Sequence, residues 1–149
     1  MKRNKPSKHA LAAKMIKQIL KKHFPKIKFN IRSRSYSGGS SVHIKWIDGP
    51  SESEVRKLVK DFEYGYFDGM TDTYIVDNYR EDIPQVKYVL LERRFSDKAI
   101  LEAIKKYGFR NVKKEDLDRT NKKLFEQFKA WTLRELGWRE LYDKSLLQK

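Results

Sequence analysis

The side chains best suited to chemistry in this sequence are the lysines and arginines near its start, which can bind phosphate groups. Residues 1–45 hold 13 Lys and Arg and neither Asp nor Glu. Phosphate binding needs several cations on one surface, because each neutralised phosphate releases counterions. We therefore predict polyanion binding by seven residues: Lys14, Lys17, Lys21, Lys28, Arg32, Arg34 and Lys45. The alternative is a solvated lysine-rich helix, although solvated faces usually mix charges of both signs.

A second candidate surface lies in residues 61–82, where seven acidic residues accompany Arg80 alone. This stretch is rich in tyrosine, and aromatic side chains are frequent at the energetically important positions of protein interfaces. The candidate partner-binding residues here and in the preceding Ser/Gly-rich segment are Tyr36, Tyr64, Tyr66, Asp68, Asp72 and Tyr74. Alternatively, the aromatic residues seal a helix against a sheet and the Asp residues only form turns. The spacing of an EF-hand is missing, so no metal site is predicted.

Residues with catalytic potential are scattered along the chain. His9, His23 and His43 have no partner at ligand spacing and no triad context. The segment 92–94 (Glu-Arg-Arg) lacks the lysine of a carboxylate-plus-lysine nuclease motif. The glycine-rich segment 35–41 can present backbone N–H groups to phosphate, but it leads into a strand and lacks the Gly-Lys-Ser/Thr of a Walker loop. We predict no catalytic residue, no cofactor and no enzymatic activity, and we interpret 35–41 equally well as a hairpin turn.

Hydrophobic periodicity indicates the elements that position these residues. Residues 7–24 have helical spacing, with three of the lysines opposite the apolar side. Residues 27–35 alternate, so that Lys28, Arg32 and Arg34 share one face of a strand, and a second strand at 42–46 completes a hairpin. A helix over 52–63 follows, with Ser51 and Glu54 as a capping box. The remaining predicted elements are strands at 73–78 and 86–95 and helices at 97–107, 115–136 and 138–146, the first two of these helices closed by Gly108 and Gly137.

Apart from the short last helix, this order is α-β-β-α-β-β-α-α and predicts an α+β fold: an antiparallel sheet of about four strands with helices packed on one face and a helical C-terminal extension. A chain of 149 residues with 39% apolar residues suits one core. We therefore expect a single domain over 1–149. Within it, 1–6 form a disordered basic arm, 7–95 the core and 96–149 the C-terminal helices.

The composition also indicates a compartment. The net charge is +14 and cysteine is absent, which fits a reducing environment. No segment approaches the roughly 18 consecutive apolar residues of a membrane span. The basic N-terminal segment is interrupted by lysines, so it lacks the apolar core of a signal peptide. We expect a cytoplasmic protein that does not associate with membranes.

Two segments carry a family resemblance. Residues 34–51 (RSYSGGSSVHIKWIDGPS) and 62–74 (FEYGYFDGMTDTY), joined by a helix, resemble the large polyvalent protein associated domain 29 family. The resemblance covers roughly the N-terminal half of the chain. It implies occurrence in phages, plasmids and other mobile elements, and it provides no catalytic residues to carry over.

Charge and resemblance together predict a non-enzymatic accessory or anti-defence protein of a mobile element. Its expected partner is nucleic acid or a host nucleoprotein, and the sharpest version is stoichiometric inhibition of a CRISPR effector nuclease. Two binding modes are compatible with this prediction. In one, the basic residues bind the backbone of the guide or target nucleic acid. In the other, the acidic, aromatic stretch occupies a basic DNA-binding groove on the effector. The alternative is a general nucleic-acid-binding accessory protein of a phage or plasmid.

Overall fold

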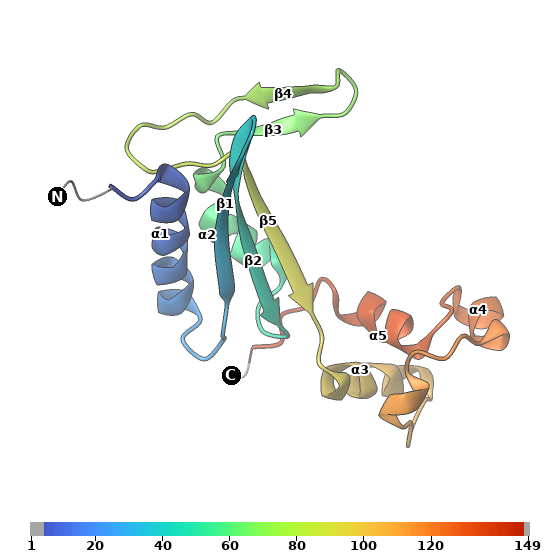
Figure 1. Cartoon of the computed structure of the whole chain (residues 1–149). Helices are drawn as coiled ribbons and strands as arrows, with labels where there is room; N and C mark the ends of the chain where they lie inside the picture. Colours follow the sequence, from blue (N-terminus) through green and yellow to red (C-terminus); the bar gives the residue numbers. More distant parts are fainter. Residues whose placement is uncertain (1–4, 148–149) are drawn as a thin grey trace. The chain divides into compact units, whose positions relative to one another are not determined.

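A computed structural model describes residues 5–147 of the chain (Figure 1). The chain divides into two compact units. The first consists of the residues up to Trp46 together with Ser53–Glu92, and the second of Ile47–Glu52 together with the residues from Arg93 onward. That both units form one domain stays a prediction, and most of the expected basic arm at 1–6 lies outside the described residues.

Residues 5–147 form helices and short strands, and three 3₁₀ turns connect some of them. The helices and strands, in order, are α1 (Lys8–His23), β1 (Asn30–Tyr36), β2 (Gly39–Ile47), α2 (Glu52–Val59), β3 (Gly65–Asp68), β4 (Thr73–Val76), β5 (Tyr88–Arg94), α3 (Asp97–Ile104), α4 (Lys122–Phe128) and α5 (Leu133–Leu141). The 3₁₀ turns are η1 (Lys60–Phe62), η2 (Lys105–Tyr107) and η3 (Lys114–Asp116).

Helix α1 begins and ends where local chemistry requires. The Ser7 hydroxyl accepts a hydrogen bond from the backbone N–H of Ala10 at 3.4 Å, which satisfies one of the free donors of the first turn. Lys21, Lys22 and His23 form the last turn, where positive charge is favourable beside the helix C-terminus. Pro25 follows and prevents continuation of the helix. The predicted helix over 7–24 therefore matches the structure closely.

The sheets differ from the prediction of one antiparallel sheet of about four strands, which is wrong. β1, β2 and β5 form a three-stranded sheet in the order β1-β2-β5, and β3 and β4 form a separate two-stranded sheet. β1 and β2 pair antiparallel. β5 runs parallel to β2, as the arrows in Figure 1 and two backbone hydrogen bonds show, Lys87 N–H to Ser40 O at 3.1 Å and Asp48 N–H to Arg94 O at 2.8 Å. The α+β class and the helical C-terminal segment are confirmed.

The parallel pairing has a physical reason in the connection between the strands. After β2 the chain crosses the sheet through α2 and the β3–β4 hairpin, and therefore re-enters the sheet at the end where β2 began. A crossover of this kind produces a parallel neighbour, whereas a tight turn produces an antiparallel one.

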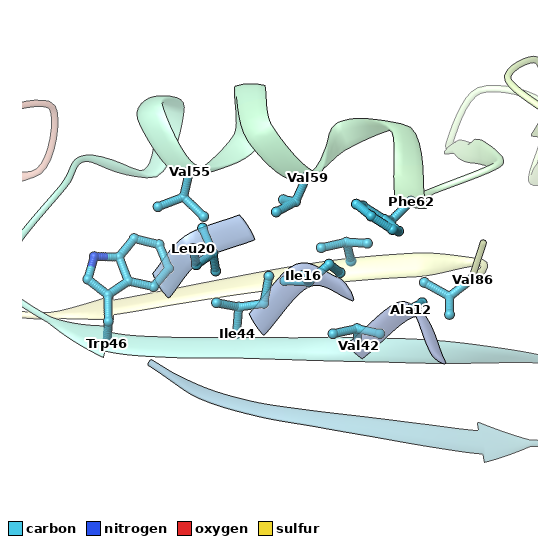
Figure 2. Packing of buried hydrophobic residues seen from close by; sticks show 11 residues of the cluster. Ala12, Ile16, Leu20, Val42, Ile44, Trp46, Val55, Val59, Phe62 and Val86 are labelled. Atoms are coloured by element: carbon cyan, nitrogen blue, oxygen red, sulfur yellow. The ribbon is translucent and has the colours of Figure 1, made fainter. Parts of the chain in front are cut away.

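Both helices of the first unit cover one face of the three-stranded sheet. Figure 2 shows Val42, Ile44 and Trp46 pointing from β2 toward the helices. The cluster is completed by Ala12, Ile16 and Leu20 of α1, Val55 and Val59 of α2, and Phe62, Val86 and Val89. Alternation along β1 and β2 leaves mostly polar residues on the other face of the sheet, where Ile47 and Leu90 are exposed apolar exceptions. We call this second surface the outer sheet face.

The second unit contains α3, α4 and α5 around two small apolar clusters. Ile100 and Ile104 of α3 pack with Leu117 and Leu141, and Leu124, Ala130 and Leu136 form the other cluster. The helix predicted at 97–107 is present as α3 followed by η2, and it ends at Gly108, which has a φ of 92°. No helix of residues 5–147 is long and apolar enough to cross a membrane.

The continuous helix predicted at 115–136 is wrong. The chain instead forms η3, α4 and α5 in this region, because two side chains cap new helix starts. Asn121 accepts hydrogen bonds from the N–H groups of two residues at the start of α4, and Thr132 accepts one from Glu135 N–H. Between them, Lys129 adopts a left-handed backbone with a φ of 58°, which ends α4.

Candidate functional site

The β3–β4 hairpin, residues 65–76, forms a small sheet of its own in the first unit; we call it the hairpin arm. Its strands pair with each other in the register Gly65↔Val76 to Asp68↔Thr73, and within residues 5–147 they join no other sheet. Gly65 makes this pairing possible. A Cβ atom at Gly65 would lie 2.1 Å from the carbonyl oxygen of Ile75, closer than any side chain allows.

The turn of the hairpin arm is built by two of the predicted partner-binding residues. One carboxylate oxygen of Asp68 accepts a hydrogen bond from Met70 N–H at 3.0 Å, and the other accepts one from the Thr71 hydroxyl at 3.0 Å. Asp72 adopts a left-handed backbone with a φ of 52°, a conformation that Asp tolerates better than most residues. Both therefore have a structural role, and their role in binding stays a prediction.

Three tyrosines that pack against one another anchor the base of the hairpin arm. Tyr64, Tyr74 and Tyr88 pack edge to face, with ring centroids 5.7 Å and 5.4 Å apart. The Tyr74 hydroxyl donates to the Lys87 carbonyl at 2.6 Å, and the Lys87 ammonium lies 4.9 Å from the centre of the Tyr74 ring. Burial, and then the nearby Glu63 carboxylate, raise the pKa of Tyr74, so it remains a hydrogen-bond donor at physiological pH.

Tyr36, at the end of β1, lies close to this base. Burial raises the pKa of Tyr64, and the proximity of Tyr36 raises it further. The following turn consists of Ser37 and Gly38, and the Lys87 ammonium donates to the Gly38 carbonyl at 3.2 Å. The glycine-rich segment is thus a tight hairpin turn between β1 and β2.

Large apolar side chains of the hairpin arm face solvent on both of its sides. Tyr66 is 49% exposed, Phe67 51% and Met70, in the turn, 97%. Tyr66 and Phe67 are consecutive in β3 and therefore point to opposite faces. A two-stranded hairpin has little stability of its own, and exposed apolar surface of this kind marks interaction sites. Sequence reasoning included Tyr66 and missed the exposure of Phe67 and Met70, which depends on β3 remaining outside the main sheet.

A hollow of about 380 Å³ lies beside the hairpin arm and is lined by Lys60, Asp61, Glu63, Gly65, Tyr66, Asp77 and Asn78. Three of these residues are carboxylates and one is a lysine. Arg80 lies near the same region, and its guanidinium is engaged by Asp82 and, at 3.6 Å, by Asp61. The hollow therefore carries negative charge next to an exposed aromatic ring.

Six of the seven cations predicted to bind polyanions lie on two surfaces of the first unit. Lys14, Lys17 and Lys21 are exposed on the side of α1 that faces away from the core. Arg32, Arg34 and Lys45 lie on the outer sheet face, because they alternate with the half-buried residues of β1 and the buried residues of β2. Since α1 covers the opposite face of the sheet, the two groups lie on opposite surfaces. Lys28 is exposed in the connection before β1.

The two cationic surfaces also differ in charge pairing. The Lys45 ammonium lies 3.3 Å from a carboxylate oxygen of Glu92, so part of its charge is balanced. Within residues 5–147, no carboxylate oxygen lies within 4.0 Å of the three α1 ammonium groups. The same part of the chain contains no group of three His, Cys, Asp or Glu residues that can hold a metal ion.

The fold and these surfaces define a two-layer α+β unit with an attached aromatic and acidic hairpin, followed by a helical unit. The family model of the large polyvalent protein associated domain 29 matches residues 7–96, which is more than half of the chain, and the chain belongs to this family. The expected resemblance is thereby confirmed, and most of the helical unit lies outside the match. No curated protein and no solved structure matches the chain.

Proposed function

We propose that this protein acts without catalysis, as a mobile-element accessory protein whose hairpin arm binds a nucleoprotein enzyme. The observation that supports this most is the exposure of Tyr66, Phe67 and Met70 on the hairpin arm, where Tyr66 also lines the acidic hollow. Burying a side chain such as Phe or Met against a partner contributes about 1.5–3 kcal/mol, so a partner groove that encloses both faces of the hairpin arm would gain an adequate hot spot.

The charge of the hairpin arm and its surroundings indicates the chemistry of the partner. Residues 61–82 hold seven acidic side chains, and the one arginine among them is engaged by Asp82 and Asp61. A cationic groove complements such a surface, because opposite potentials steer association and disfavour wrong partners. Enzymes that hold nucleic acid have cationic grooves of this kind. Occurrence of the family in phages and plasmids favours a host defence enzyme, and inhibition of a CRISPR effector nuclease is the sharpest version.

Titration of the purified protein into cleavage reactions of CRISPR effector nucleases tests this version. We expect cleavage to stop near one protein per effector. The triple variant Tyr66→Ala/Phe67→Ala/Met70→Ala should restore cleavage, whereas Leu90→Ala, an exposed apolar residue of β5, should inhibit like the wild type. Unaltered cleavage across the effectors in the presence of wild-type protein would refute it. Capture from host lysate, with and without nuclease treatment, then identifies other nucleoprotein partners.

Direct nucleic-acid binding is a second candidate function, favoured by the exposed α1 lysines and their lack of nearby carboxylates in the described chain. It predicts an affinity that falls steeply with salt. The variant Lys14→Glu/Lys17→Glu/Lys21→Glu should reduce the slope of log K against log salt by about 2.7, since each phosphate contact contributes about 0.9. Absence of any gel shift at about 50 mM salt would exclude this candidate.

A further inference from the structure

The second unit exposes three large aromatic side chains outside the family match. Trp131 is 45% exposed, Trp138 48% and Tyr142 54%. Each belongs to a nearly parallel stack. The rings of Phe125 and Trp131 lie 4.1 Å apart with an interplanar angle of 14°, and those of Trp138 and Tyr142 lie 5.5 Å apart, also at 14°. The unit therefore exposes stacked aromatic rings to solvent at two places.

The backbone around these stacks is held by hydrogen bonds. Trp131 N–H donates to the Glu135 carboxylate at 2.8 Å, and the Trp131 carbonyl accepts from Asn121 N–H at 2.9 Å. Trp138 and Tyr142 lie one helical turn apart at the end of α5, and Tyr142 N–H donates to the Trp138 carbonyl at 2.9 Å. Such fixed platforms lose little conformational entropy when another ring stacks on them.

Cations are numerous in the part of the second unit that precedes Trp131, in contrast to the acidic surroundings of the hairpin arm. Residues 105–129 hold nine Lys and Arg against four Asp and Glu. The Lys129 ammonium lies 5.4 Å from the centre of the Phe125 ring. Lys122 and Lys123 are exposed at the start of α4, and within residues 5–147 no carboxylate oxygen lies within 4.0 Å of either ammonium group. A partner with negative charge and exposed planar rings complements this combination.

We propose that the second unit binds single-stranded nucleic acid. Trp131 and the Trp138/Tyr142 stack bind bases by stacking, while Lys122, Lys123 and Lys129 contact phosphates. Proteins that bind single strands combine aromatic platforms with cationic surfaces, because every base has a π face and every nucleotide a phosphate. Duplex nucleic acid hides its base faces and is a poorer ligand for this surface. The inference goes beyond the proposed function, which assigns the hairpin arm of the first unit to a protein partner.

The test uses the full chain and labelled oligothymidylate of about 20 nucleotides, measured by fluorescence anisotropy at about 50 mM salt. Trp131→Ala and Trp138→Ala should each weaken binding by about 5- to 150-fold, because a stacked base contributes about 1–3 kcal/mol. Trp131→Phe should retain most of the affinity. Tyr79→Ala, which removes an exposed aromatic ring of the first unit, is the matched control and should bind like the wild type. An oligouridylate and a duplex of the same length distinguish DNA, RNA and double-stranded ligands.

The outcomes separate the proposal from its alternatives. Preference for either single strand over duplex, lost in the two Trp→Ala variants, supports it. Three results would overturn it: no binding of either oligonucleotide, equal binding of duplex, or an affinity that both Trp→Ala variants leave unchanged. Circular dichroism of each variant shows whether the overall helical content is retained. Loss of oligonucleotide binding in Lys14→Glu/Lys17→Glu/Lys21→Glu, with Trp131→Ala unaffected, would instead assign nucleic acid to α1.

Discussion

Replacing Arg93 with methionine removes a buried guanidinium that holds together parts of the second unit distant in sequence. Arg93 is 6% exposed. Its Nε donates to the Asp48 carbonyl at 2.9 Å and one terminal nitrogen to the Gly49 carbonyl at 2.8 Å. The other terminal nitrogen makes longer contacts, 3.4 Å and 3.5 Å, with the carbonyls of Leu141 and Tyr142. One side chain thereby connects the turn after β2 with the end of α5.

The magnitude of the effect follows from these contacts. Hydrogen bonds from a charged donor contribute about 1.5–3 kcal/mol each, and carbonyls left buried without a donor add a desolvation cost. Methionine preserves much of the apolar stem, so a large cavity is not expected. The two short hydrogen bonds contribute most of this free energy and the two long ones contribute little. Arg93→Met should therefore destabilise the second unit by about 3–5 kcal/mol.

Hydrogen exchange of the α5 backbone amides, followed by mass spectrometry, measures this loss. Since about 1.4 kcal/mol corresponds to a factor of ten, exchange should accelerate by at least about 100-fold. Arg110→Met, at an exposed arginine of the same unit, is the matched control and should leave exchange unchanged. If Arg93→Met accelerated exchange no more than Arg110→Met, the assignment of Arg93 as the connection between the turn and α5 would be refuted.

Three further perturbations test other parts of the structure. Gly65→Ala should separate β3 from β4, because its Cβ would lie 2.1 Å from the Ile75 carbonyl, and amide protection of the hairpin arm should be lost. Hydrogen bonds from Lys144 first, and then from a tyrosine and a second lysine, lower the pKa of Glu140 to about 2. Its stabilising contribution is therefore present above its unfolded pKa of about 4.3 and is lost as the pH falls toward 2, so Glu140→Gln should flatten the pH dependence of the urea midpoint there. Ser96→Ala should cost about 1–2 kcal/mol in urea unfolding, because it removes the N-cap of α3.

Each of these variants has a control. Gly69→Ala should preserve the hairpin arm, because a Cβ at Gly69 meets no atom within 4 Å; equal loss of protection in both variants would contradict the close-approach argument. Glu126→Gln removes an exposed carboxylate and should keep the wild-type acid profile. Ser96→Thr retains a capping hydroxyl and should recover most of the lost stability, and a Thr variant as unstable as Ala would exclude the capping role.

The elements of the N-terminal region could be predicted because their signals are local. Ser7 and Pro25 mark the ends of α1, and alternation along β1 correctly separates Ile31 from Arg32. The C-terminal region was less predictable. Apolar residues continue at near-helical spacing through 115–136, and this periodicity concealed the helix starts at Asn121 and Thr132. Gly137, expected to end a helix, lies inside α5, where a Cβ atom would come within 2.9 Å of an Ile100 methyl group.

The sequence predicted which residues belong to the candidate sites better than it predicted their positions and exposure in the fold. The charge along the chain located the basic and the acidic stretches, and it marked Tyr66, Asp68 and Asp72 as a group. It provided no signal for the exposure of Phe67 and Met70, since an apolar residue in a short strand is normally buried. They are exposed because β3 pairs with β4 alone and not with a strand of the three-stranded sheet. The local sequence does not show which of these strands β3 pairs with.

The sequence by itself determined which residues share a face of one element, because helical and strand periodicities depend only on the local backbone. It thus placed Lys14, Lys17 and Lys21 together, and likewise Arg32 and Arg34. Only the tertiary structure decided that these two groups lie on opposite surfaces and that β5 joins β2 in parallel. The physical reason is that the choice of which faces meet depends on burying apolar surface between elements far apart in the chain, and a local pattern contains no information on that choice.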